Sequence, residues 1–253
     1  MAEGFDSKQR FSERAAYYAR NRPAYPEKIL RYLERELSFS RISTVADVGS
    51  GTGIFSEMLL RNGNTVFGIE PNKDMRMVAQ ARLSTYPKFR SINGTAESTT
   101  LPDESVDFIT AAQSFHWFDR SRTKVEFRRI LRRSGWVVLV WNTRKTTTPF
   151  LQAYDELLND AHIMRRRVRH EDINEKTLRS FLGEFKEVRL PNFQELDYEG
   201  LVGRLLSASY APLPGEPHYD EVTGKLREIF DTYEIGGHVA FEYETELYAG
   251  RLS

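Results

Sequence analysis

Three glycines at alternate positions, Gly49, Gly51 and Gly53, constrain the fold of this chain more than any other feature. The apolar run that ends at Val48 has the length and β-branched character of a buried strand, and the residues after Gly53 carry apolar side chains at helical spacing. The glycines therefore lie on a turn from a strand to a helix. Because glycine has no Cβ atom, such a turn permits positive φ angles and close approach of a ligand to the backbone.

The spacing of the turn narrows the class of ligand. The pattern is D-x-G-x-G-x-G starting at Asp47, which is neither the G-x-G-x-x-G of dinucleotide folds nor a P-loop with its lysine, so nothing indicates a phosphate. A carboxylate at this point suits a cationic or amine-bearing ligand. A second apolar run, 65–69, ends at Glu70, and an acidic residue at the end of the second strand is placed to accept hydrogen bonds from both ribose hydroxyls.

The segment from Val45 to Gln80, including Pro71-Asn72-Lys73-Asp74-Met75, resembles the cofactor-binding half of the class I S-adenosylmethionine-dependent methyltransferases. The resemblance implies that the glycines let the backbone approach the methionine part of S-adenosylmethionine, that Asp47 lies close to it, and that Glu70 holds the ribose. The loop from Gly94 to Glu97 is similar to one that lies beside the adenine in this family. The cofactor-binding residues expected on this basis are Arg22, Asp47, Gly49, Ser50, Gly51, Thr52, Gly53, Glu70, Pro71, Met75, Thr95, Ala96, Glu97, Gln113, Ser114 and Phe115.

Composition excludes several other classes of protein. The chain has 253 residues, enough for one α/β domain with a large core, and its 36 basic and 36 acidic residues argue against a dedicated binder of nucleic acid or anionic membranes. It has no cysteine, which excludes disulfides, thiolate zinc sites and cysteine nucleophiles, and its five scattered histidines indicate no metal site. With neither a signal sequence nor a membrane-spanning run, the protein is expected to be soluble and cytoplasmic.

Residues 8–37 are predicted as helix interrupted by one proline-rich turn. The stretch from Tyr18 to Pro26 reads Y-x-x-x-R-P-x-Y-P and resembles a segment that closes over the cofactor in relatives of trans-aconitate methyltransferase, a small-molecule, type 11-like subgroup. The resemblance implies that residues 1–40 cover the cofactor and that Arg22 pairs with its methionine carboxylate. A packed aromatic face is the simpler interpretation of Tyr17, Tyr18 and Tyr25.

The second informative stretch runs from Gln113 to Asp119, because it leaves the fourth strand at the edge where open α/β sheets bind ligands. It resembles the segment that lies between the sulfonium and the acceptor in the same subgroup. His116 is either a hydrogen-bonded structural histidine, or a general base or substrate-orienting group, since its reference pKa lies near neutral pH. Tyr18, His116, Trp117 and Tyr210 are the expected substrate-binding residues.

The remaining pattern predicts a doubly wound, seven-stranded α/β sheet, mainly parallel, that closes with an antiparallel C-terminal strand. A helix is expected over 119–134, ended by Ser134-Gly135, and a strand over 136–141. We expect a single domain over 1–253, in which the elements at about 142–182 and 199–235 form a substrate cap. The basic run 165–170 in this cap either lies on a solvated face or attracts an anionic acceptor.

The leading function is transfer of a methyl group from S-adenosylmethionine to a small organic acceptor by in-line displacement. Two alternatives stay open: a methyltransferase that acts on nucleic acid or protein, and a non-catalytic S-adenosylmethionine-binding protein. No N/D-P-P-Y/F motif follows the fourth strand, and formal neutrality also counts against nucleic acid. Neither the acceptor nor the oligomeric state is indicated by the sequence.

Overall fold

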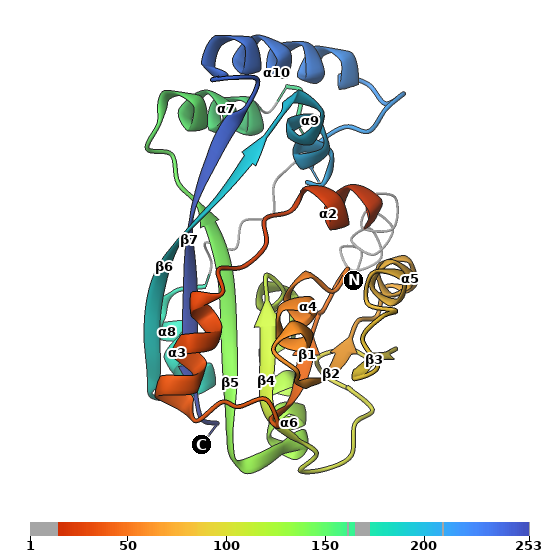
Figure 1. Cartoon of the computed structure of the whole chain (residues 1–253), viewed down its shortest axis with the longest axis vertical. Helices are drawn as coiled ribbons and strands as arrows, with labels where there is room; N and C mark the ends of the chain where they lie inside the picture. The colour runs from red at the N-terminus through yellow and green to blue at the C-terminus, as the bar shows by residue number, and fades with distance from the viewer. Residues whose placement is uncertain (1–14, 161, 165–172, 209, 253) are drawn as a thin grey trace. The chain divides into compact units, whose positions relative to one another are not determined.

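The computed structural model of this chain describes residues 15–160, 162–164, 173–208 and 210–252 (Figure 1). The first part of the predicted N-terminal helix, 8–14, and the basic run 165–170 lie outside the described residues. The chain divides into two compact units. The first, here called the sheet unit, comprises 24–142, 170–190 and 245–253; the second, the helical unit, comprises 1–23, 143–169 and 191–244.

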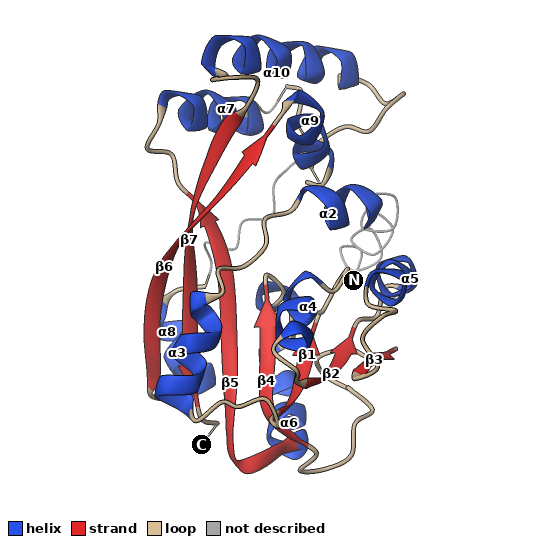
Figure 2. Ribbon diagram, viewed as in Figure 1, coloured by secondary structure: helices blue, strands red, loops and turns tan. Residues whose placement is uncertain are grey.

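The described residues form a seven-stranded sheet in the order β3-β2-β1-β4-β5-β7-β6 (Figure 2). The pairs β3–β2, β2–β1, β1–β4 and β4–β5 are parallel. Because β2 and β4 lie on opposite sides of β1, the connections on the two sides of β1 run in opposite directions along the sheet, and ligands of open α/β sheets bind at such a point. The strands are β1 Thr44–Val48, β2 Thr65–Ile69, β3 Phe89–Ile92, β4 Val106–Ala112, β5 Leu131–Arg144, β6 Phe185–Leu196 and β7 Val239–Gly250.

The last strand, β7, runs antiparallel to β5. The Lys145 N–H donates to the Glu242 carbonyl over 2.9 Å, and the Thr245 hydroxyl donates to Asn142 Oδ1 over 2.5 Å. Residue numbers therefore rise along β5 in the direction in which they fall along β7. The mixed, seven-stranded α/β fold predicted from the sequence is therefore confirmed.

Helices begin mostly at side chains that cap their free N–H groups. Asn72 Oδ1 accepts from the N–H groups of Asp74 and Met75, Asp119 caps the next helix in the same way, and Thr148 precedes a proline at the start of a third. The described helices are α2 Ala15–Asn21, α3 Lys28–Leu37, α4 Ile54–Arg61, α5 Lys73–Arg82, the short η1 Phe115–Trp117, α6 Arg120–Ile130, α7 Pro149–Asn159, α8 Glu175–Leu182, α9 Tyr198–Leu206 and α10 Tyr219–Tyr233.

The predicted boundary between helix 119–134 and strand 136–141 is wrong. Helix α6 ends at Ile130, and β5 begins at Leu131, which pairs with Val106 before a register shift. Gly135 lies within this strand rather than at a helix end, and a Cβ atom there would lie 2.6 Å from the Leu131 side chain and 2.7 Å from the Asp107 carbonyl. Gly135 is therefore a position of close packing. In a sequence, a glycine of this kind looks the same as one that ends a helix.

The sheet unit packs helices against both faces of the sheet, because neighbouring strand residues point to opposite faces. Val45, Val66 and Val138 pack with α3 and α4, whereas Ala46 and Val137 pack with α6 and α8. The helical unit has a separate apolar core from α7, α9, α10 and the parts of β6 and β7 that belong to it. None of the described helices has both the length and the hydropathy of a membrane span.

Candidate functional site

The glycine turn joins β1 to α4 at the carboxyl edge of the sheet. Backbone N–H groups of Gly49 and Ser50 donate to the Ile69 carbonyl over 2.8 and 3.1 Å, which fixes the turn to the end of β2. Gly49, Gly51 and Gly53 have φ angles of 68°, 56° and 81°, a region that side-chain-bearing residues rarely adopt. The local conformation predicted from the sequence is thus confirmed.

The three glycines do not serve the same purpose. A Cβ atom on Gly49 would lie 2.5 Å from Ser114 Cβ, and one on Gly53 would lie 2.7 Å from Leu83 Cδ1, so these two positions allow close packing within the protein. A Cβ atom on Gly51 would meet no protein atom within 4 Å. Gly51 is therefore the glycine of the turn whose missing side chain leaves the backbone open to a ligand.

Asp47 lies beneath the turn and is 1% exposed. Its two carboxylate oxygens accept hydrogen bonds from the hydroxyls of Ser56, over 2.6 Å, and Thr110, over 2.9 Å. Burial raises the pKa of Asp47 to about 6, against the lowering effect of these hydrogen bonds. The carboxyl group is thus tied to the protein on both oxygens, a role that sequence reasoning did not assign to Ser56 and Thr110.

Glu70 connects the second strand to the glycine turn. Its Oε2 accepts from the Gly51 N–H over 3.0 Å, and its Oε1 accepts from the Asn72 N–H over 2.8 Å. Burial raises the pKa of Glu70, while the two backbone hydrogen bonds oppose the rise. Because each carboxylate oxygen has more than one accepting position, Glu70 can still accept hydrogen bonds from a ligand.

Three other predicted residues lie along the same edge. Thr52 is 1% exposed, and its hydroxyl has no hydrogen-bond partner among the described residues. Pro71 precedes α5, and Met75 in the first turn of that helix is 4% exposed, so its side chain belongs to the core. Of these three side chains, that of Thr52 offers a hydroxyl group for a hydrogen bond with a ligand.

The predicted adenine loop, 94–97, is a tight turn held by backbone hydrogen bonds between Thr95 and Ser98. Ala96 is buried, and Glu97 Oε1 accepts from the Asp119 N–H over 2.9 Å. This bond fastens the loop to the start of α6. The carboxylate of Glu97 thus contacts the segment that follows the fourth strand.

The segment after β4 is hydrogen-bonded to the end of β1, next to the glycine turn. Ser114 donates from its hydroxyl to the Val48 carbonyl over 2.8 Å and fills the space beside Gly49. Gln113 adopts a positive φ of 59° and donates from its side-chain amide to the Asn142 carbonyl over 3.1 Å. These contacts bring the predicted residues of this segment to the same edge as the turn.

The aromatic residues of this segment divide into buried and accessible ones. Phe115 is fully buried and packs against Phe181, with ring centroids 4.7 Å apart, so its side chain belongs to the core. His116 is partly buried, and its ring lies 5.0 Å from that of Trp117, which is 44% exposed. His116 and Trp117 are therefore the two side chains of η1 that can face a ligand.

Tyr18, Arg22 and Tyr210 belong to the helical unit, where Arg22 lies over the Tyr18 ring at 4.7 Å. Arg204 lies in the same unit, close enough that its charge lowers the pKa of Arg22 after the larger effect of burial. The sequence analysis did not single out Arg204. A signal was available, since a cation three residues after Leu201 interrupts the apolar face of α9.

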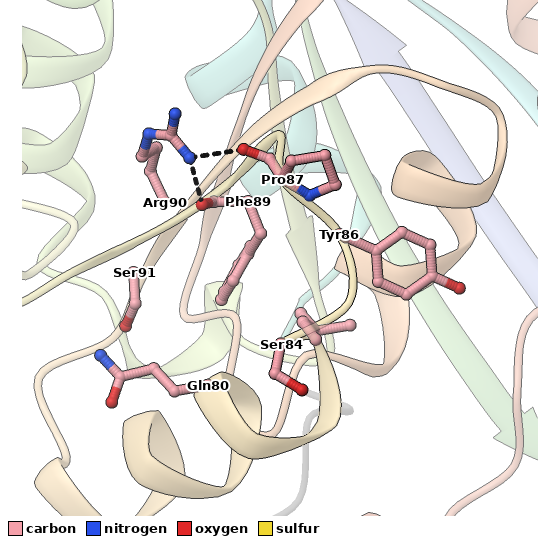
Figure 3. A pocket seen from close by; sticks show the side chains of 8 residues that line it. Gln80, Ser84, Tyr86, Pro87, Phe89, Arg90 and Ser91 are labelled. Atoms are coloured by element: carbon pink, nitrogen blue, oxygen red, sulfur yellow. Dashed lines mark hydrogen bonds between the residues drawn. The ribbon is translucent and has the colours of Figure 1, made fainter.

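A shallow pocket elsewhere in the sheet unit lies between the end of α5 and β3 (Figure 3). Its lining includes Gln80, Tyr86 and Arg90, whose guanidinium donates to the carbonyls of Pro87 and Phe89. The lining residues include no carboxylate or histidine. Among the described residues, no group of three or more histidine, aspartate or glutamate side chains is placed to hold a metal ion.

Residues 46–139 match the family model described as a methyltransferase domain. Over 159 residues the chain is 34% identical to an uncharacterized methyltransferase of Mycobacterium bovis, a match that covers 62% of this chain and 63% of that protein. An uncharacterized methyltransferase-like protein of Schizosaccharomyces pombe is 31% identical, with 62% and 60% covered. The chain thus matches less than two thirds of the length of these relatives.

A putative type II methyltransferase from Anaeromyxobacter dehalogenans has a similar fold. Its structure superposes with a TM-score of 0.70 at 23% identity, covering 91% of this chain and 98% of that one. The similarity therefore includes the fold of both units rather than the matched segment 46–139 alone.

Proposed function

We propose that this chain, which belongs to the family of class I S-adenosylmethionine-dependent methyltransferases, transfers a methyl group from S-adenosylmethionine to a small organic acceptor. Assignment to the subgroup of trans-aconitate methyltransferase relatives stays a prediction. The proposal depends on one observation above all: the carboxylate of Glu70 is hydrogen-bonded to the backbone of Gly51, the glycine that is open to a ligand.

The residues at the carboxyl edge suit S-adenosylmethionine. Glu70 would accept hydrogen bonds from the ribose hydroxyls with the accepting positions that its two backbone partners leave open. The buried Thr52 hydroxyl, which has no partner among the described residues, would gain one from the ligand. Gly51 would let the ligand lie against the backbone. The loop 94–97 is proposed to contact the adenine.

S-adenosylmethionine supplies a methyl group on a positively charged sulfur, which makes that carbon electrophilic. The protein then has to hold a nucleophilic atom of the acceptor in line with the methyl group and exclude water. The acceptor's lone pair forms the new bond to the methyl carbon, and the electron pair of the broken carbon–sulfur bond stays on sulfur. Where the acceptor must also lose a proton, a nearby base accelerates the step.

His116 is the proposed base, with one ring nitrogen as the proton acceptor. Two features support it: its position two residues after Ser114, which is bonded to the end of β1, and its partial exposure beside Trp117. A histidine at an accessible edge can exchange a proton near neutral pH. Replacement by asparagine should lower kcat and leave the affinity for S-adenosylhomocysteine unchanged if His116 acts on the acceptor alone.

Calorimetric titration with S-adenosylmethionine and S-adenosylhomocysteine tests the cofactor. Both should bind the wild type, and Glu70→Ala should bind about 100-fold more weakly or worse, because two hydrogen bonds to a charged group are lost. Glu187→Ala is the matched control, since it removes an exposed carboxylate of β6 that pairs with Arg189. If neither ligand binds the wild type, the proposed function is wrong.

A second measurement separates an enzyme from a non-catalytic binder. The wild-type protein is incubated with methyl-labelled S-adenosylmethionine and a panel of small organic acids, amines and alcohols, and transfer of label is followed. Label in a small acceptor supports the proposal. Label only in protein or nucleic acid, or binding with no transfer to any acceptor, supports one of the two alternatives instead.

A further inference from the structure

Helix α6 carries one buried carboxylate that the proposed cofactor chemistry does not use. Glu126 is the only acidic residue between Arg120 and Ile130, and it is 8% exposed. A glutamate is rarely this buried unless its charge is paired. Glu126 and the residues that bind it, Thr99 and Arg129, all belong to the sheet unit. The geometry of these contacts indicates what the carboxylate does.

Glu126 accepts hydrogen bonds from two residues that come from different parts of the chain. Arg129, one turn further along α6, donates from Nε to Oε2 over 2.8 Å and from Nη2 to Oε1 over 2.7 Å. Thr99 donates to the same Oε1 from its backbone N–H, over 2.8 Å, and from its hydroxyl, over 2.6 Å. The hydrogen bonds from Arg129 are the main reason that the pKa of Glu126 is held at about 2, so the carboxylate is ionised at neutral pH.

Thr99 directly follows the loop that is proposed to contact the adenine. The Thr95 N–H donates to the Ser98 carbonyl over 3.0 Å, so Thr99 is the first residue beyond the hydrogen bond that closes this turn. Its side chain is fully buried. Glu126 therefore holds the chain at the end of the loop 94–97.

A second carboxylate attaches the loop itself to the same helix. Glu97 Oε1 accepts from the backbone N–H of Asp119, the residue that caps the start of α6, over 2.9 Å. Residues 119 and 126 are separated by about two helical turns. The loop is thus attached to α6 at two points that lie well apart, and two such attachments fix its orientation as well as its position.

The charge of Glu126 strengthens the attachment. Hydrogen bonds to an ionised acceptor are stronger than those between neutral groups, and Arg129 supplies the counter-charge that compensates for burial of the carboxylate. A neutral amide at position 126 would keep the length of the side chain, but its NH₂ group would face the N–H groups of either Arg129 or Thr99. Glu126→Gln should therefore loosen the loop without creating a cavity.

We propose that Glu126 is a positioning residue for recognition of the adenine base, because it holds the loop 94–97 in the conformation that contacts the edge of the base. This inference depends on the proposed function, in which that loop contacts the adenine of S-adenosylmethionine. Glu126 itself would not touch the cofactor. A site whose hydrogen-bonding groups are fixed in place rejects a ligand with different groups. A loosely held loop can shift to suit either ligand, so discrimination between bases should fall.

The ratio of two affinities measures this discrimination. S-inosylhomocysteine differs from S-adenosylhomocysteine in the base alone, where a carbonyl replaces the exocyclic amino group and N1 carries a proton. In calorimetric titrations of the full chain, the wild type should bind S-adenosylhomocysteine about 100-fold or more tightly than the inosine analogue. Glu126→Gln should reduce this ratio by about tenfold or more. A purely structural role for Glu126 would lower stability and leave the ratio unchanged.

Asp107→Asn is the matched control. Asp107 also accepts from a backbone N–H, that of Thr44 over 2.8 Å, and from an arginine, Arg132, over 2.7 Å. Its contacts lie at the amino ends of β1 and β4, which is the edge of the sheet opposite to the glycine turn. The control should therefore keep the wild-type ratio of affinities.

A milder pair of variants tests the same attachment if Glu126→Gln does not fold. Thr99→Val removes the hydroxyl and keeps the backbone hydrogen bond to Glu126, so the ratio should fall, whereas Thr99→Ser keeps the hydroxyl and should keep the ratio. The proposal is overturned if the wild type binds both ligands equally, if Thr99→Val and a folded Glu126→Gln keep the wild-type ratio, or if the ratio falls as far in Asp107→Asn. Failure of the wild type to bind S-adenosylhomocysteine would instead refute the proposed function.

Discussion

Replacement of Gly51 by alanine separates ligand binding from stability at the glycine turn. The backbone of Gly51 has a φ of 56°, and a side-chain-bearing residue in this region costs about 1–2 kcal/mol. The added methyl group would meet no protein atom within 4 Å, so no further loss of stability is expected. The free energy of unfolding of Gly51→Ala should therefore fall by about 1–2 kcal/mol.

The substitution should also weaken cofactor binding, for a reason separate from the loss of stability. If S-adenosylmethionine lies against Gly51, the methyl group overpacks the site at a cost of about 1–3 kcal/mol, which weakens binding by about 5- to 150-fold. Urea unfolding gives the stability, and calorimetric titration with S-adenosylhomocysteine gives the affinity. Both are measured on the same preparations at one temperature.

Gly236→Ala is the matched control for this prediction. Gly236 has a φ of 62°, and a Cβ atom there would also meet nothing within 4 Å, but it lies in the turn before β7. It should lose a similar amount of stability and keep its affinity for S-adenosylhomocysteine. Wild-type affinity in Gly51→Ala, or an equal loss of affinity in both variants, would refute the assignment of Gly51 as the ligand-facing glycine.

Two further predictions concern stability. The pKa of Asp47 is about 6 in the folded protein against an ordinary 3.8, so the folded protein binds the proton of this carboxyl group more tightly than the unfolded chain does. The free energy of unfolding should therefore fall by about 3 kcal/mol as the pH rises from below 3.8 to above 6. Urea unfolding across this range should show that component in the wild type, and a variant Asp47→Asn that keeps it would contradict the assignment. Phe115→Ala should cost about 3–5 kcal/mol because the ring is fully buried, whereas Trp117→Ala should cost less than about 1 kcal/mol. Denaturant midpoints of the two variants, compared with the wild type, test this contrast, and equal losses would count against it.

Local patterns in the sequence predicted much of the fold. The strand ending at Val48, the helix after Gly53 and the acidic residue after the second strand all lie where the periodicity placed them, because each depends on interactions between near neighbours. The boundary at Leu131 was missed, because strand pairing with Val106 outweighs the local helical pattern.

The sequence by itself determined the glycine turn and the place of Glu70 after the second strand, since both depend on a single turn and the strand next to it. Only the tertiary structure decided what each residue does there. Gly49 and Gly53 proved to be packing positions, because Ser114 and Leu83 come from distant parts of the chain to fill the space beside them. Arg22 and Arg204 likewise meet only in the folded chain, because both donate hydrogen bonds to Ser207. Contacts between distant residues fix the burial and charge of a site, and these decide its chemistry.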